Sequence, residues 1–255
     1  MPLLRSLRSL ISLLTRIPVG SQDVEEAAQY FYLVPLIGLV EGLAISLAIV
    51  VLRAICENSL MASSLYLVAH LAVVGGMHLD GFADYFDVVG SQKRGASAIP
   101  ILKDPRRGTF SILAVVVNFL VSAVSVSVLL ESLESSTDLA LYLVCAYLAS
   151  SESMFLTCFL GREEPYEGLA KSFSRYSKKS ESLVKNLAIY ALTLLALQVL
   201  WHSHILAIFA LLPVATSLIT SRDANERIGF VNGDVLGFSY ETSRVSALVL
   251  AALVA

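Results

Sequence analysis

The chain has 255 residues, of which 56% are hydrophobic and 15% are charged, and its mean hydropathy is +0.73. A soluble domain averages roughly 45–50% apolar and about 25% charged residues, so the composition excludes an ordinary soluble domain, a disordered chain and a disulfide-stapled secreted module. The net charge of −3 gives no indication of nucleic-acid binding.

The first element of the chain covers residues 3–17, where Arg5, Arg8 and Arg16 stand among leucines. This apolar run is too broken by charge for a cleaved signal peptide. The pattern instead predicts an amphipathic helix that lies on a membrane surface.

Long apolar blocks follow, and most approach the roughly 20 residues that a membrane-spanning helix needs. They lie at about residues 31–52, 60–77, 110–130, 139–160, 183–201 and 204–221, with a shorter one at 243–255. We therefore predict an all-α, polytopic integral membrane protein with about seven transmembrane helices plus the N-terminal interfacial helix. Residues 1–255 are expected to form a single domain.

The charges between these blocks predict the topology. If the N-terminus is cytoplasmic and seven spans follow, every lysine and arginine except Arg53 falls on the same side of the membrane as the N-terminus. The connection Glu131–Asp138, on the opposite side, carries acidic residues and no basic ones. This bias is typical of a cytoplasmic face, so we expect a multi-pass protein of the cytoplasmic membrane. The long loops 78–109, 161–182 and 222–242 lie on the same side, and long loops are usually functional.

The first long loop contains Asp80, Asp84 and Asp87 at positions i, i+4 and i+7. If the second span continues as a helix, all three carboxylates project from one face. They repel one another unless a cation lies between them, and Mg²⁺ prefers carboxylates, water and substrate phosphates. The pattern favours a magnesium site over a solvated acidic helix face. Mg²⁺ disfavours imidazole, so His78 is expected to hydrogen-bond an aspartate or a phosphate.

A basic segment precedes the third span, and it reads Lys103-Asp104-Pro105-Arg106-Arg107-Gly108-Thr109. Guanidinium and ammonium groups beside a carboxylate-bound metal form a phosphate clamp. The amides at the start of the next helix also favour anions. A simple salt bridge of Asp104 with its neighbours is the alternative. Together with the three aspartates, this segment makes phosphoryl transfer the leading reaction class.

These motifs resemble those of the cobalamin synthase family, the adenosylcobinamide-GDP ribazoletransferases. The matching pieces cover nearly the whole chain. They are Thr15-Arg16-Ile17-Pro18, Pro35-Leu36-Ile37-Gly38, His78-Leu79-Asp80-Gly81-Phe82-Ala83-Asp84 with Asp87, Lys103-Asp104-Pro105-Arg106, Gly108-Thr109-Phe110, Glu167-Gly168-Leu169, and Gly233-Asp234-Val235-Leu236-Gly237 with Glu241.

The resemblance implies a membrane enzyme that joins adenosylcobinamide-GDP to α-ribazole or its 5′-phosphate. The products would be adenosylcobalamin or its phosphate and GMP, with Mg²⁺ as cofactor and a cytoplasmic active site. The expected partners are these substrates and the lipid bilayer, with no nucleic acid, and a homo-oligomer stays open. The implied site residues are Asp80, Asp84, Asp87 and Asp104 for the metal, Asp84 or Asp87 as proton acceptor with His78 beside them, and Lys103, Arg106, Arg107, Asp234 and Glu241 for phosphate and substrate.

Two other classes are weighed against this one. A CDP-alcohol phosphotransferase would place an Ala-Arg pair in its acidic motif, whereas here Ala83 is followed by Asp84. A transporter would carry charges near the middle of the bilayer, and Glu41, inside the first predicted span, is the residue that favours it. Glu41 departs from the family pattern, and it is either a functional carboxylate, a protonated one, or one that reaches the basic interface.

Overall fold

The computed structural model describes residues 2–20, 23–104, 106–201 and 206–255, and over these ranges the predicted all-α fold is confirmed. Pro105 of the basic segment lies outside the described residues. The long helices are α3 (Val34–Ile55), α7 (Thr109–Ser132), α8 (Ser136–Leu160), α10 (Ser180–Trp201), α11 (Leu206–Arg227) and α12 (Gly233–Val254). The shorter ones are α1 (Pro2–Leu14), α2 (Val24–Gln29), α4 (Ser59–Val73), α5 (Met77–Ser91), α6 (Ile99–Leu102) and α9 (Leu169–Ser177), with 3₁₀ turns η1 (Phe31–Leu33) and η2 (Gly95–Ser97).

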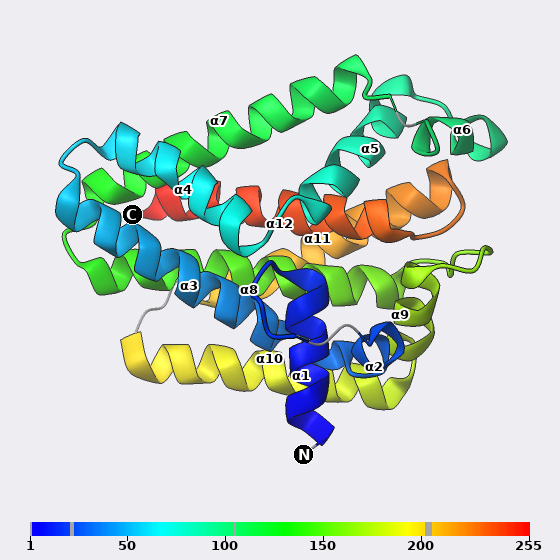
Figure 1. Cartoon of the computed structure of the whole chain (residues 1–255), viewed down its shortest axis with the longest axis horizontal. Coiled ribbons are helices and arrows are strands. Elements are labelled where there is room, and N and C mark those ends of the chain that lie inside the picture. Colours follow the sequence, from blue (N-terminus) through cyan, green and yellow to red (C-terminus); the bar gives the residue numbers. More distant parts are fainter. Residues whose placement is uncertain (1, 21–22, 105, 202–205) are drawn as a thin grey trace.

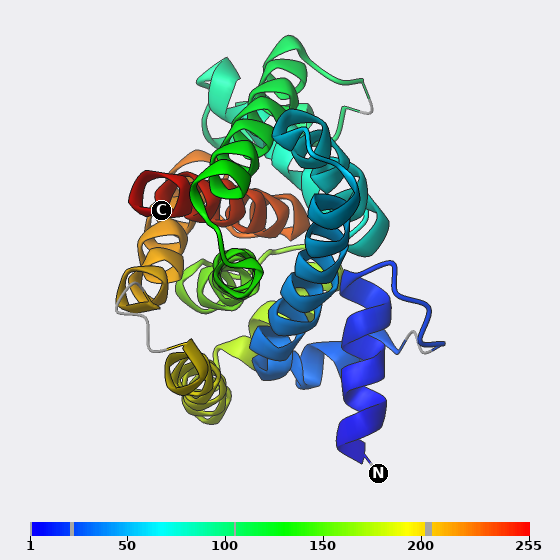
Figure 2. The ribbon, with the colours of Figure 1, turned by 90° about the vertical axis from the view of Figure 1, so that its left-hand side faces the viewer.

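Helix α8 forms the centre of the bundle and is seen end-on in Figure 2. It contacts α3, α11 and α12, and nearly all of its residues between Leu139 and Cys158 are buried. A helix without a polar face is stable when it is buried on every side, so α8 acts as the core around which the other helices pack.

Five of the described helices are long and apolar enough to cross a membrane: α3 together with η1, α7, α8, α10 and α11. The pair α4 and α5 makes a sixth if the two count as one bent span. The block expected as a seventh span, at 243–255, is the second half of α12, which begins at Gly233 and is not among these candidates. The loop expected over residues 222–242 is correspondingly short, because α11 runs to Arg227.

The second predicted span does not continue as one helix. It ends at Val73, and the chain turns by 101° before α5 begins. Gly75 makes this turn with a φ of +87°, and the N–H of Arg16 donates to the carbonyl of Val73 at 2.8 Å. The N-terminal segment therefore fastens the bend, and α5 lies oblique to the long helices (Figure 1).

The connections between helices gather at two ends of the bundle, as the sequence predicts. Residues 92–104, 106–108, 161–168 and 228–232 lie toward the right of Figure 1, and the connections 56–58 and 133–135 lie toward the left. The end with the long connections is also the end where α5 lies. Which end faces the cytoplasm stays a prediction.

The predicted amphipathic N-terminal helix is confirmed as α1. Leu10 and Leu14 are buried against the bundle, whereas Leu3 and Leu4 are more than half exposed. The helix runs across the direction of the long helices in Figure 1. Its position at a membrane surface stays a prediction.

Candidate functional site

Helix α5 positions the predicted acidic motif, and it packs closely against the start of α12. A methyl group at Gly81 would lie 2.8 Å from Cα of Asp234, and one at Gly237 would lie 2.5 Å from the carbonyl oxygen of His78. Only glycine allows so close an approach. The Gly-Asp motif of α12 thus brings Asp234 next to Asp80, although 154 residues separate them in sequence.

Gly237→Ala is expected to push α5 and α12 apart. Overpacking of a tight interface costs about 1–3 kcal/mol, and a displacement of about 1 Å in a catalytic site can cost 10²-fold in rate. We expect a lower midpoint of thermal unfolding and a transfer rate reduced by one to two orders of magnitude. Gly76→Ala is the matched control, because a methyl group there meets nothing within 4 Å; equal effects of both substitutions would contradict the close-approach interpretation.

Arg107 joins the first two aspartates of the motif. Its guanidinium forms ion pairs with both Asp80 and Asp84, which lie one helical turn apart on α5. The side chains of Asp80 and Asp84 are 60% and 21% exposed, so solutes reach both carboxylates. Two carboxylates that already enclose a cationic group are a donor set that suits Mg²⁺.

The four predicted metal-binding aspartates do not form one cluster. In the described part of the chain, no group of three or more His, Cys, Asp or Glu side chains is arranged to hold a metal ion. Asp80 and Asp84 form one pair, and Asp87 and Asp104 face a different pocket. The roles of the four residues stay predictions, and the structure divides them between two places.

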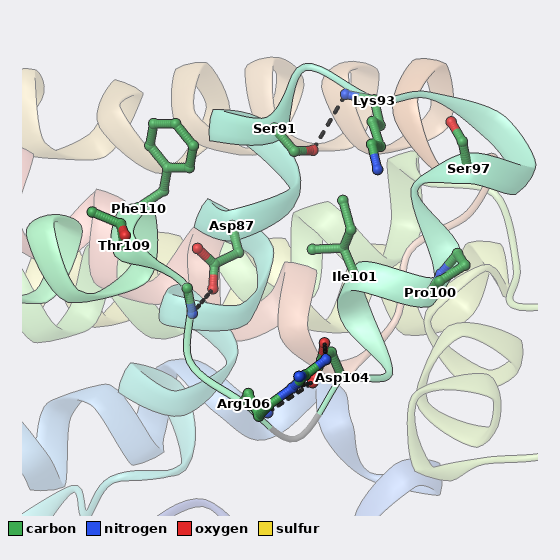
Figure 3. Close-up of a pocket in the computed structure, with 11 residues that line it drawn as sticks. Asp87, Ser91, Lys93, Ser97, Pro100, Ile101, Asp104, Arg106, Thr109 and Phe110 are labelled. Carbon is green, nitrogen blue, oxygen red and sulfur yellow. Dashed lines mark hydrogen bonds and ion pairs between the residues drawn. The ribbon is translucent and has the colours of Figure 1, made fainter.

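Asp87 binds the N-terminus of α7. The N–H of Gly108 donates to its Oδ2 at 2.8 Å (Figure 3). The N–H of Ser111 donates to its Oδ1 at 2.9 Å. The sequence predicts that the amides at the start of this helix are available to a substrate anion. That prediction is wrong for the amides of Gly108 and Ser111. A carboxylate of the protein already satisfies them, as helix N-termini require.

Asp104 forms a local ion pair, the alternative that the sequence left open. Its carboxylate accepts hydrogen bonds from Nε and Nη2 of Arg106, at 2.9 and 2.8 Å, and from the Arg106 backbone N–H at 3.0 Å. These hydrogen bonds lower the pKa of Asp104 to about 2, so it is ionised at neutral pH. Lys103 turns elsewhere, with its ammonium group 4.7 Å from the centre of the Tyr166 ring.

A pocket of about 580 Å³ opens between α5, α6 and the start of α7 (Figure 3). Lys93 and Arg106 supply positive charge to it, and Asp87 and Asp104 supply negative charge. Its lining residues are Asp87, Ser91, Lys93, Ser97, Pro100, Ile101, Asp104, Arg106, Gly108, Thr109 and Phe110. Its volume lies within the roughly 300–1,000 Å³ of sites that enclose a small-molecule ligand.

Glu241, predicted to bind substrate, lies in a polar network inside the bundle. Its Oε2 accepts hydrogen bonds from Nε and Nη2 of Arg244, at 3.0 and 2.6 Å, and its Oε1 lies 3.2 Å from Nε2 of His70. Arg244 also donates to Asn118 at 2.7 Å and to Tyr66 at 2.8 Å. All five side chains are buried. Glu241 is seven residues beyond Asp234, or about 10 Å along the helix.

The placement of Arg244 corrects the topology analysis, which assigned it to the cytoplasmic side. Arg244 has no exposed surface and lies within α12. The sequence does carry a signal for this, because Glu241 and Arg244 stand at i and i+3, the spacing of an ion pair on one helix face. The expectation that ionisable residues gather at one edge is therefore wrong for this pair, which is neutralised internally.

Glu41 is buried as well, and it is connected to the acidic helix through Tyr240. The hydroxyl of Tyr240 donates to Glu41 at 2.7 Å, and the Tyr240 ring stacks on His78 with ring centres 4.3 Å apart. His78 itself is 4% exposed, and its Nε2 has no hydrogen-bond partner among the described residues. Glu41 therefore lies within the bundle and does not reach the basic interface.

The similarity to known proteins extends over nearly the whole chain. A family model described as cobalamin-5-phosphate synthase matches residues 6–252. Among curated proteins, the adenosylcobinamide-GDP ribazoletransferase of Clostridium acetobutylicum is 29% identical over 98% of this chain and 96% of its own length. Those of Pyrococcus abyssi and Desulfitobacterium hafniense are each 31% identical, over 96% and 98% of this chain and 96% and 97% of their own lengths. No solved structure matches.

Proposed function

Because the chain belongs to the cobalamin-5-phosphate synthase family, we propose that it catalyses the reaction for which its curated relatives are named, the transfer between adenosylcobinamide-GDP and ribazole. It is a transferase of cobalamin biosynthesis built on helices that are long and apolar enough to span a membrane. The match over residues 6–252 is the observation that carries this function. The finer features below are proposals that the site geometry supports.

The proposed reaction is a phosphoryl transfer. A hydroxyl of α-ribazole, or of its 5′-phosphate, attacks the phosphorus that carries cobinamide, and the bond from that phosphorus to the oxygen of GMP breaks. The products are adenosylcobalamin or its 5′-phosphate and GMP, and the hydroxyl proton must be accepted. Transfers of this class depend on positioning and on charge neutralisation more than on covalent help from the protein.

Asp80 and Asp84, with Asp234 beside them, are the residues that would hold Mg²⁺. When bound, the metal would neutralise the charge of the diphosphate. Arg107 already lies at Asp80 and Asp84, so its guanidinium is in reach of a phosphate held there. Lys93 and Arg106 in the 580 Å³ pocket would bind the remaining phosphate oxygens.

Of the two aspartates predicted as proton acceptor, the geometry favours Asp84. Both carboxylate oxygens of Asp87 accept backbone hydrogen bonds, and such bonds favour the charged form and make a carboxylate a weaker base. Asp84 instead faces Arg107, a contact that a substrate phosphate can replace. We assign Asp87 to positioning α7 and its basic segment, and we assign the proton to an oxygen of Asp84 that the metal would leave free.

The reaction can be tested with the purified protein in detergent. Adenosylcobinamide-GDP, α-ribazole and Mg²⁺ are added, and release of GMP together with a complete corrinoid is followed by liquid chromatography. GMP and product should appear in equal amounts, and only with both substrates. Absence of both would reject the proposed function, and transfer from a CDP-alcohol to an alcohol acceptor instead would favour the alternative class.

Arg106→Ala is expected to weaken use of adenosylcobinamide-GDP. A hydrogen bond to a charged group contributes about 1.5–3 kcal/mol, so kcat/KM should fall roughly 10-fold or more. Steady-state kinetics with varied adenosylcobinamide-GDP measures this. Arg53→Ala, at the opposite end of the bundle, is the control and should leave kcat/KM near the wild-type value. Unchanged kinetics of Arg106→Ala would remove this residue from the phosphate site.

The cytoplasmic position of the site can be tested by cysteine labelling in intact cells. Cys56, Cys145 and Cys158 are first replaced by alanine, and single cysteines are then introduced at Ala96 and Ser136, which are exposed at opposite ends of the bundle. An impermeant thiol reagent should label position 136 and leave position 96 unlabelled until the cells are opened. Labelling of position 96 alone would place the site on the outer face.

A further inference from the structure

A second cavity, of about 230 Å³, adjoins the carboxylates of Asp80 and Asp234 and shares no lining residue with the 580 Å³ pocket. It lies between α1, η1, α5, α8, α9 and the start of α12. Its lining residues are Leu14, Phe31, Met77, His78, Asp80, Gly81, Met154, Leu169, Ala170, Phe173, Gly233, Asp234 and Leu236. Two reactants must meet at the carboxylates, and this cavity is a second compartment beside them.

The walls of this cavity suit an uncharged aromatic ring. Phe31 and Phe173 meet edge to face with ring centres 4.7 Å apart, and both are buried together with Met154. Among the described residues that line the cavity none is lysine or arginine, and Asp80 and Asp234 contribute negative charge. A diphosphate would be repelled here, whereas the 580 Å³ pocket has the cations that a diphosphate needs.

The size of the cavity limits what it can hold. Sites that enclose a whole drug-sized ligand measure roughly 300–1,000 Å³, so 230 Å³ accommodates only part of a substrate, such as one flat ring system. A corrinoid ring is much too large. The bicyclic benzimidazole of ribazole is a flat, apolar fragment of suitable size.

His78 gives this cavity a buried ring nitrogen, Nε2, that forms no hydrogen bond with any described side chain. Burying a polar atom without a hydrogen bond is unfavourable, and Nε2 of His78 is buried without one among the described residues. The stacking on Tyr240 and the hydrogen bond from Tyr240 to Glu41 fix the imidazole plane. A ribose hydroxyl could form the missing hydrogen bond.

We propose that this cavity is the acceptor subsite, which binds the benzimidazole base of ribazole between Phe31, Met154 and Phe173. The ribose then lies at His78 and Asp80, where its hydroxyl meets the phosphorus held at the carboxylates. The inference rests on the proposed function, because it takes the acceptor from it. It adds that base selectivity is set by η1, α8 and α9 and not by the acidic helix.

Two variants of opposite effect test the subsite. Ala170, which is buried on α9 and lines the cavity, is replaced by phenylalanine to fill it, and Met154→Ala enlarges it. Ala170→Phe should raise KM for α-ribazole about 10-fold or more, a typical effect of changed pocket shape, and leave KM for adenosylcobinamide-GDP nearly unchanged. Met154→Ala should shift the ratio of kcat/KM toward the riboside of the wider naphthimidazole, by about 10-fold.

A matched control fills a different cavity. Ala114 is equally buried on α7 and lines a groove of about 440 Å³ between α5, α7 and α12; Ala114→Phe should leave both KM for α-ribazole and the base preference unchanged. Binding of α-ribazole alone is also measured by titration calorimetry with each folded variant. This readout needs no turnover, so it separates the subsite from the proposed function.

The outcomes are distinguishable. Absence of GMP release by the wild-type protein would reject the proposed function, and calorimetry would still show whether Ala170→Phe weakens α-ribazole binding. If the wild-type protein turns over but neither Ala170→Phe nor Met154→Ala changes KM or base preference, the acceptor subsite is overturned and the function stands. If Ala170→Phe does not fold, Met154→Ala decides alone.

Discussion

Asp84→Asn, and likewise Asp80→Asn, is expected to abolish transfer while the protein still folds. Asparagine keeps the shape of the side chain but removes one of the charges that oppose Arg107 and would hold Mg²⁺. Removal of one preorganised electrostatic group from an active site typically costs about 10²–10³-fold in kcat, and loss of a proton acceptor at Asp84 adds to this. Turnover is measured at saturating substrates over a range of Mg²⁺ concentrations.

The control for both variants is Asp138→Asn. This carboxylate lies in the first turn of α8, at the end of the bundle opposite α5, and is exposed. Its loss should leave turnover unchanged. Near wild-type turnover of Asp84→Asn at saturating Mg²⁺ would show that Asp84 neither holds the metal nor accepts the proton. A normal unfolding midpoint in all three variants would confirm that the loss is catalytic.

Arg244→Leu is expected to have the largest effect on stability. The substitution leaves Glu241 buried without its strongest partner, and breaking a buried pair in this way costs about 3–5 kcal/mol. Asn118 and Tyr66 lose hydrogen-bond partners at the same time. Thermal unfolding in detergent should show a markedly lower midpoint, and gel filtration should show aggregated protein.

The double variant Arg244→Leu/Glu241→Leu separates structure from substrate binding. Removing both charges should restore much of the stability, because a buried pair is often replaceable by apolar residues. If Glu241 also binds substrate, as the family resemblance implies, the restored protein stays inactive. Arg222→Leu breaks an exposed pair with Glu226 and is the control, since such pairs contribute about 0–1 kcal/mol. A midpoint of Arg244→Leu equal to that control would contradict a stabilising network.

The sequence predicts those parts of the site that depend on periodicity within one helix. The i, i+4, i+7 spacing places Asp80 and Asp84 together on α5. The grouping of the long connections at one end of the bundle follows from the alternation of apolar blocks and charged loops. Each of these signals lies within a short stretch of sequence or in the order of such stretches along the chain.

Features that depend on a distant partner are not predictable in this way. Asp87 has the same spacing as its neighbours, but its role is decided by the N-terminus of α7, where the Gly108 and Ser111 amides donate to its carboxylate. Hydropathy predicts one span where α4 and α5 form two helices, because the turn is made by Gly75 and fastened by Arg16. The charge of Arg244 suggests an aqueous position until Glu241 and Asn118 are seen around it.

The composition of α12 has a consequence for how the protein is made. It is the last helix of the chain, and unlike five others it is not apolar enough to count as a membrane span by itself. Each unpaired charge at the centre of a bilayer helix opposes insertion by about 2.5–3.5 kcal/mol, and α12 carries both Glu241 and Arg244. It can enter stably only against helices that already offer Tyr66, His70 and Asn118. Insertion of α12 is thus coupled to assembly of the helices around it, and the Gly-Asp motif reaches Asp80 only once α12 has packed against them.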